Sequence, residues 1–177
     1  MGIETLKSSL GAFAKDNKLN LSSMLSQANY GGLDQKLVWG VALACSYSLE
    51  DKSLQEALEQ DAKDKDLFTE KDINGIKTAV SLMAMTNVYY RFLHLADDKD
   101  ISSMPAGLRM NTMLNPGIDR LSFEVYSLAV SVLNGCGKCI KAHILTLEKE
   151  GLSKQAIQAV AKITSIINAS KISLSLS

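Results

Sequence analysis

Apolar residues recur every three or four positions through most of this chain, which is the spacing that places them on one face of an α-helix. The pattern predicts helices over residues 2–15, 20–27, 34–48, 52–64, 70–95, 118–133, 136–150 and 153–172. Asp34, Asp51, Thr69 and Ser153 stand at N-cap positions, and Gly151 follows the seventh predicted helix. The sequence therefore predicts an all-α fold, a bundle of about eight helices.

Helical periodicity is lost between residues 97 and 117, a stretch that holds both prolines, Pro105 and Pro116. We interpret it as the main non-helical connection within a single domain that spans residues 1–177. The apolar runs that begin at Trp39 and Tyr126 resemble each other faintly. This likeness suggests two quasi-repeated halves, with the connection as their boundary.

Composition narrows the functional classes. With 177 residues, 46% of them hydrophobic, the chain can bury one sizeable core. The 19 basic and 19 acidic residues cancel, and no basic cluster is interleaved with aromatic residues, so we expect no nucleic-acid partner. No apolar run is long enough to span a bilayer, and the N-terminus lacks the apolar segment of a signal peptide. Three cysteines do not form a disulfide scaffold, so we expect a protein of the reducing cytoplasm, without a membrane.

The segment Cys136-Gly-Lys-Cys139-Ile-Lys-Ala-His143 is the most informative part of the sequence. Residues three and four apart share a helix face, so both thiols and the imidazole converge. Asn134 and Gly135 predict a helix stop just before, which places Cys136 at the positive end of the next helix dipole. That position favours the thiolate, the form that attacks peroxides and disulfides.

Glu124 lies in a predicted helix that is apolar almost all round beyond it. If the two helices form an antiparallel hairpin about Asn134-Gly135, Glu124 lies roughly 15 Å from the turn along one helix and His143 roughly 12 Å along the other. The two side chains should be neighbours, and a buried carboxylate needs such a partner. Glu124, His143 and the cysteines can then act together as a proton relay.

Two structural alternatives remain for the same residues. The cysteines could be small buried hydrophobic side chains at helical spacing. The Cys-x-x-Cys-x-x-x-His spacing could also supply three zinc ligands, with Glu124 or the distant Cys45 as the fourth. Cys45 itself lies in an apolar helical run, and we interpret it as inert core.

Other residues with donor atoms give weaker signals. His94 lies between two leucines at a helix end, and we interpret it as structural or exposed. Met83, Met85, Met110 and Met113 fit core filling better than any ligand set.

The motif as a whole resembles a known family. It consists of Glu124, eleven intervening residues, Cys136-x-x-Cys139, three more residues and His143. It resembles the alkyl hydroperoxide reductase D family (AhpD), in the broader group that includes carboxymuconolactone decarboxylase. The likeness extends over nearly the whole chain, through Ala14-Lys-Asp-Asn-Lys-Leu-Asn-Leu-Ser-Ser, Asn87-Val-Tyr-Tyr-Arg91, Gly107-Leu-Arg-Met-Asn111 and Asn115-Pro-Gly-Ile.

The resemblance implies a bacterial, all-helical homotrimer with weak thiol peroxidase activity and no bound cofactor. Its main task would be to reduce the catalytic disulfide of a partner peroxiredoxin, AhpC. Electrons would come from dihydrolipoamide on a lipoylated dehydrogenase subunit, which dihydrolipoamide dehydrogenase and NADH keep reduced. The alternatives are a decarboxylase-like enzyme that uses the relay without thiol redox chemistry, and a non-enzymatic zinc-stabilised interaction domain.

The resemblance also assigns roles to residues. Cys139 would form the sulfenic acid, and Cys136 would give the proton, close the disulfide and form mixed disulfides with the partner. Glu124 and His143 would be the proton relay. Lys138 departs from the family, which commonly has His before the second cysteine. Its charge could stabilise a thiolate, but an ammonium group is a poor proton shuttle at neutral pH.

Overall fold

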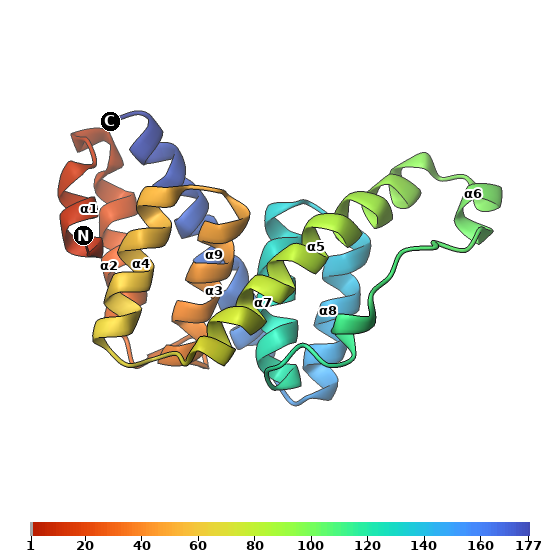
Figure 1. Cartoon of the computed structure of the whole chain (residues 1–177). Helices are drawn as coiled ribbons and strands as arrows, with labels where there is room; N and C mark the ends of the chain where they lie inside the picture. The colour runs from red at the N-terminus through yellow and green to blue at the C-terminus, as the bar shows by residue number, and fades with distance from the viewer. Residues whose placement is uncertain (1) are drawn as a thin grey trace.

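The computed structural model describes residues 2–177, and their regular structure is almost entirely helical (Figure 1). The α-helices are α1 (Ile3–Ser9), α2 (Lys15–Ser26), α3 (Gln35–Ser48), α4 (Lys52–Asp64), α5 (Glu70–Ala96), α6 (Lys99–Ser103), α7 (Arg120–Leu133), α8 (Gly137–Lys149) and α9 (Lys154–Ser175). Two 3₁₀ turns, η1 (Ala12–Ala14) and η2 (Asn111–Met113), and a small hairpin of β1 (Asn29–Tyr30) and β2 (Leu33–Asp34) complete the list. The predicted all-α class is confirmed. Within the described residues, no helix is both long and apolar enough to cross a membrane.

Local signals set the starts of the long helices. Asp34, Asp51 and Ser153 each accept a hydrogen bond from the backbone amide three residues further on. Thr69 does the same and also forms a capping box with Asp72. All four predicted N-caps are confirmed. They could be predicted because a cap needs only a short polar side chain at the right place in the chain.

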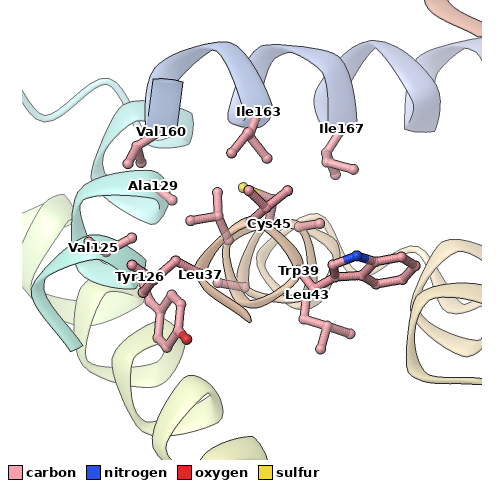
Figure 2. Packing of buried hydrophobic residues seen from close by; sticks show 14 of the residues in the cluster. Leu37, Trp39, Leu43, Cys45, Val125, Tyr126, Ala129, Val160, Ile163 and Ile167 are labelled. Carbon is pink, nitrogen blue, oxygen red and sulfur yellow. The ribbon is translucent and has the colours of Figure 1, made fainter. Parts of the chain in front are cut away.

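Helix α3 lies at the centre of the bundle. Every residue from Leu37 to Ser46 is buried, and α3 packs against α4, α5, α7 and α9. Figure 2 shows Cys45 of α3 facing α9 and the ring of Tyr126 on α7 beside α3. Gly40 permits this approach, since a Cβ atom there would lie 2.4 Å from Tyr126. The core is therefore built around one helix that is covered on all sides.

Two helix pairs have matching lengths on either side of the long connection. Helices α3 and α4 have 14 and 13 residues, and so do α7 and α8. Each pair is followed by a longer helix, α5 or α9. Helix α5 lies along α7 and α8, and its far end runs out beyond the bundle towards α6 (Figure 1).

The prediction for the N-terminal region is wrong in its boundaries. The expected helix over 2–15 ends at Ser9, where Leu10 adopts an extended conformation, and α2 begins at Lys15 instead of residue 20. Ile3, Leu6 and Leu10 are all buried and keep helical spacing up to the break. The apolar period therefore gave no sign that the chain turns at this point.

Two short elements were not predicted. The hairpin of β1 and β2 turns at Gly31 and Gly32, both with positive φ, as a tight two-residue turn requires. The connection over 97–117 is not wholly non-helical, because Asp98 caps the five-residue helix α6 and η2 follows it. Elements this short leave almost no periodic pattern in a sequence.

Candidate active site

The turn between α7 and α8 places the first cysteine. Gly135 has a φ of +63°, its amide donates to the carbonyl of Val132, and the amide of Cys136 donates to the carbonyl of Ser131. These two bonds form a Schellman motif, the ending that Asn134-Gly135 predicts. Cys136 therefore follows the turn directly and is also the N-cap of α8, where its Sγ accepts from the amide of Cys139 at 3.3 Å.

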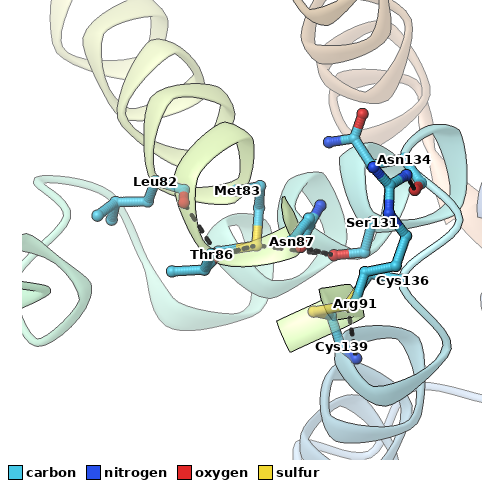
Figure 3. Close-up of a disulfide and its surroundings, with 9 residues drawn as sticks. All are labelled: Leu82, Met83, Thr86, Asn87, Arg91, Ser131, Asn134, Cys136 and Cys139. Carbon is cyan, nitrogen blue, oxygen red and sulfur yellow. Dashed lines mark hydrogen bonds between the residues drawn. A yellow bond between two sulfur atoms is a disulfide. The ribbon is translucent and has the colours of Figure 1, made fainter. Parts of the chain in front are cut away.

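The two cysteines of the motif form a disulfide within the first turn of α8 (Figure 3). Their Cα atoms are 5.3 Å apart. Cys136 is 0% exposed and Cys139 is 7% exposed. The two sulfurs thus differ in access, and Cys139 is the one nearer to solvent.

Glu124 and His143 meet across the α7–α8 hairpin. Nδ1 of His143 lies 2.7 Å from Oε2 of Glu124, and each residue is only 9% exposed. The structure thus brings together the two side chains that the hairpin geometry predicts to be neighbours. Because the carboxylate holds Nδ1, Nε2 is the ring nitrogen that can exchange a proton with another molecule.

A largely apolar cavity of about 390 Å³ lies beside this cluster. Helix α5, the connection and α8 all contribute to its wall, which consists of Met83, Thr86, Tyr90, Met110, Met113, Lys138, Cys139, Ala142 and His143. Cys139 and His143 therefore border the same space, whereas Cys136 does not. A small organic molecule in this cavity would meet one sulfur and the imidazole together.

The methionines divide between the core and the cavity. Met83 belongs to the core, as predicted, and Met85 and Met113 are partly buried and pack against it. Met110 is partly buried and, together with Met113, lines the cavity. Met83 is buried and also reaches the cavity wall. Sequence reasoning missed their place because the cavity combines three segments that are distant in the chain.

Lys138 lies at the rim of the cavity. Its side chain is exposed, and Nζ lies 5.3 Å from the centre of the Tyr90 ring. This cation–π contact directs the ammonium group across the ring face. Lys138 also borders a second hollow, whose wall includes His94, Asp97 and Asp98. His94 therefore lies outside the Glu124–His143 cluster.

Cys45 lies far from this site, in the core between α3 and α9. It is completely buried, and its Sγ donates to Oγ1 of Thr164 at 3.6 Å. Burial raises the pKa of this thiol to about 12, so it stays protonated. Cys45 contacts Thr164 and does not join the cysteines of the motif, and no group of three or more acidic, His or Cys side chains in residues 2–177 is arranged to hold a metal.

Helix α5 also contacts the turn that carries Cys136. Nη1 of Arg91 donates to the carbonyl of Asn134, and the hydroxyl of Ser131 donates to Oδ1 of Asn87 at 3.1 Å. Asn87 and Arg91 are the two ends of a sequence block that the family resemblance singled out. Their spacing of four residues was the available signal that both face the same neighbour.

Comparison with known proteins adds independent information. The model of the carboxymuconolactone decarboxylase family matches residues 100–173, which include Glu124, both cysteines of the motif and His143. A protein of Coxiella burnetii (strain RSA 493 / Nine Mile phase I) named alkyl hydroperoxide reductase AhpD is 46% identical over 166 residues, covering 94% of this chain and 93% of that protein. A protein of Brucella abortus (strain 2308) with the same name is 45% identical over 174 residues, covering 98% and 97%. A third, from Azorhizobium caulinodans, is 42% identical over 174 residues, covering 98% and 93%.

Proposed function

Because this chain belongs to the alkyl hydroperoxide reductase AhpD family, we propose that it is an oxidoreductase that reduces organic hydroperoxides with a Cys136–Cys139 dithiol. One observation supports this most strongly. Cys139 borders an apolar cavity beside the buried His143–Glu124 pair. A nucleophile, a proton relay and room for an alkyl group therefore lie in one place.

The proposed reaction has two steps. In the reduced enzyme the Cys139 thiolate attacks the hydroperoxide, the O–O bond breaks, and the sulfur becomes a sulfenic acid while the organic part leaves as an alkoxide. His143, held by Glu124, donates the proton that converts the alkoxide to an alcohol. We assign this proton to His143 instead of Cys136, because His143 borders the cavity and Cys136 does not. The Cys136 thiol then attacks the sulfenic sulfur, water leaves, and the disulfide closes.

Access favours Cys139 as the sulfur that meets the peroxide. The resemblance gives Cys136 the mixed disulfide with a protein partner, yet Cys136 is 0% exposed in the disulfide state. We therefore propose that the first turn of α8 opens when a partner thiol engages. The cysteines are near the start of the helix, where opening disrupts the fewest backbone hydrogen bonds.

We propose that electrons come from dihydrolipoamide on a lipoylated dehydrogenase subunit and pass to the peroxiredoxin AhpC. A dithiol donor reduces the Cys136–Cys139 disulfide by exchange, and the regenerated dithiol reduces the AhpC disulfide in the same way. The support is the family resemblance together with the printed name of the relatives. In this scheme the direct reduction of peroxides is the weaker activity.

The second candidate function is a decarboxylase-like reaction, which the name of the matching family model favours. It would use Glu124 and His143 for proton transfer without redox change at sulfur. The two candidates therefore differ in whether the cysteines are needed.

The test is the consumption of cumene hydroperoxide with dihydrolipoamide as reductant. We expect Cys139→Ser to abolish turnover, because the attacking sulfur is lost. Cys45→Ser is the matched control and should keep wild-type turnover, since Cys45 lies in the core away from the site. Retained turnover in Cys139→Ser would refute thiol peroxidase chemistry at this sulfur, whereas a decarboxylase-like enzyme would consume no cumene hydroperoxide even as the wild type.

A further inference from the structure

One face of α5 is directed at the end of α7. Met83, Asn87 and Arg91 follow one another at four-residue intervals and therefore share this face. All three make polar contacts with residues of the α7–α8 turn, as Figure 3 shows. The cavity residues Thr86 and Tyr90 lie next to them on the same helix.

Arg91 binds one end of the turn. A Schellman motif uses the carbonyls of Ser131 and Val132, so the carbonyl of Asn134 is left to find another donor. The guanidinium of Arg91 supplies it, in a hydrogen bond that is strengthened by its charge. Arg91 is partly buried, so water competes less for this bond.

Asn87 binds the other end. Its Oδ1 accepts from the hydroxyl of Ser131 at 3.1 Å, and the backbone carbonyl of Ser131 accepts from the amide of Cys136 at 3.1 Å. Asn87 and Ser131 are both 0% exposed. Nδ2 of Asn87 has no hydrogen-bond partner among the described residues, so the bond to Ser131 is the one that fixes this side chain.

We infer that Asn87 and Arg91 are positioning residues that hold the turn 131–136, and with it Cys136, in the place from which it closes the disulfide with Cys139. The two anchors bind Ser131 and Asn134, on the α7 side of Cys136, and neither binds Cys139, which lies three residues further along in α8. Loosening the anchors would therefore move one sulfur relative to the other. The inference rests on the proposed function for its reaction step, in which the Cys136 thiol displaces water from the Cys139 sulfenic acid.

The effect should appear in the effective concentration of the two sulfurs. Fixing reacting groups in one geometry raises both the rate of an intramolecular step and its equilibrium constant. A turn that moves freely would close the disulfide more slowly and hold it less firmly. A purely structural role for Arg91 would lower the melting temperature and leave both quantities unchanged.

The test uses Arg91→Met with Arg109→Met as the matched control, since Arg109 is exposed on the connection. We would measure the equilibrium of the Cys136–Cys139 pair in buffers of reduced and oxidised glutathione, which needs no peroxide. We expect Arg91→Met to lower the equilibrium constant for disulfide formation about tenfold, equal to about 30 mV, and Arg109→Met to leave it unchanged. Arg91→Lys, which keeps a donor, should recover part of the loss.

The second measurement is rapid quenching after one equivalent of cumene hydroperoxide, with dimedone to trap sulfenic acid. We expect more trapped Cys139 in Arg91→Met than in the wild type, because closure is slower. Ser131→Ala, a milder change that removes only the hydroxyl bound by Asn87, should move both measurements in the same direction if Arg91→Met does not fold. Wild-type values in the folded variants would overturn the inference. Absence of sulfenic acid even in Cys136→Ser would instead refute the proposed function, and the glutathione equilibrium would still decide the inference.

Discussion

In the proposed relay, Glu124 and His143 act as a pair. A histidine with Nδ1 2.7 Å from a carboxylate is fixed in ring orientation, and its Nε2 is directed to whatever lies beyond. In the proposed reaction the carboxylate faces the imidazole ring from which Nε2 passes its proton to the alkoxide. Because both residues are only 9% exposed, bulk water competes little for the hydrogen bond between them.

We expect Glu124→Gln to reduce peroxide turnover by about 100-fold or more, the usual contribution of a positioned acid–base group. Glutamine keeps the shape of the side chain but loses the charge that stabilises the imidazolium. The measurement is kcat for cumene hydroperoxide with dihydrolipoamide. Glu148→Gln is the control, because Glu148 is exposed on α8. The glutathione equilibrium of the cysteines should not change, and a turnover within twofold of wild type would contradict the relay.

The residues of the site differ in how far the sequence could reveal them. Glu124 and His143 could be paired because they lie on two helices joined by a short turn. The distance of each residue from the turn then determines which side chains are neighbours. Tyr90 and Met113 could not be placed in the same way. They reach the cavity from α5 and the long connection, and no local rule sets how these segments pack on α8.

The capping box at the start of α5 includes a carboxylate, Asp72, so its contribution to stability depends on pH. Burial alone would raise the pKa of Asp72, but hydrogen bonds from Thr69 and the nearby ammonium of Lys36 outweigh it and lower that pKa below its ordinary value of 3.8. A folded-state pKa below the unfolded one stabilises the fold above the unfolded value. This contribution is lost as the pH falls through the folded-state pKa.

We therefore expect Asp72→Asn to destabilise the protein at neutral pH and to lose its effect under acid conditions. The expected loss is roughly 0.5–1 kcal/mol at pH 7, because Asp72 is partly exposed and solvent screens its charge. Urea unfolding of both proteins between pH 3 and pH 7 measures the difference. Asp66→Asn, at an exposed turn, should show no such pH dependence. A difference that stays constant across this range would contradict the argument.

The ends of helices could be predicted where neighbouring residues in the sequence determine them. They could not be predicted where tertiary packing determines them. The N-caps Asp51 and Ser153 and the stop at Gly135 act through backbone groups a few residues away. The break after Ser9 has another cause. Leu10 is buried although the helix ends at Ser9. Its apolar side chain would be expected in a continuing helix as well, so it could not reveal the bend.

The helices differ in how far other parts of the chain bury them. The centre of the bundle encloses α3 completely, whereas the far end of α5 runs out towards α6 (Figure 1). Val88, Phe92 and Leu95 on this end are each more than half exposed. Their spacing of four and three residues makes one apolar stripe on the helix. Stripes of this kind mark surfaces that another protein covers.

We propose that the stripe of Val88, Phe92 and Leu95 is covered by other copies of this chain in the homotrimer that the family resemblance implies. Sedimentation equilibrium should then give three times the chain mass of 19.2 kDa. Phe92→Glu should shift the mass towards the monomer, because it would bury a charge at each contact. Leu19→Glu, at an equally exposed leucine on α2, should leave the trimer intact. A monomeric wild type at micromolar concentration, or a trimer unaffected by Phe92→Glu, would contradict this assignment.

Since α5 also carries Arg91, the glutathione equilibrium of the Phe92→Glu monomer would further show whether assembly helps to hold the turn before Cys136.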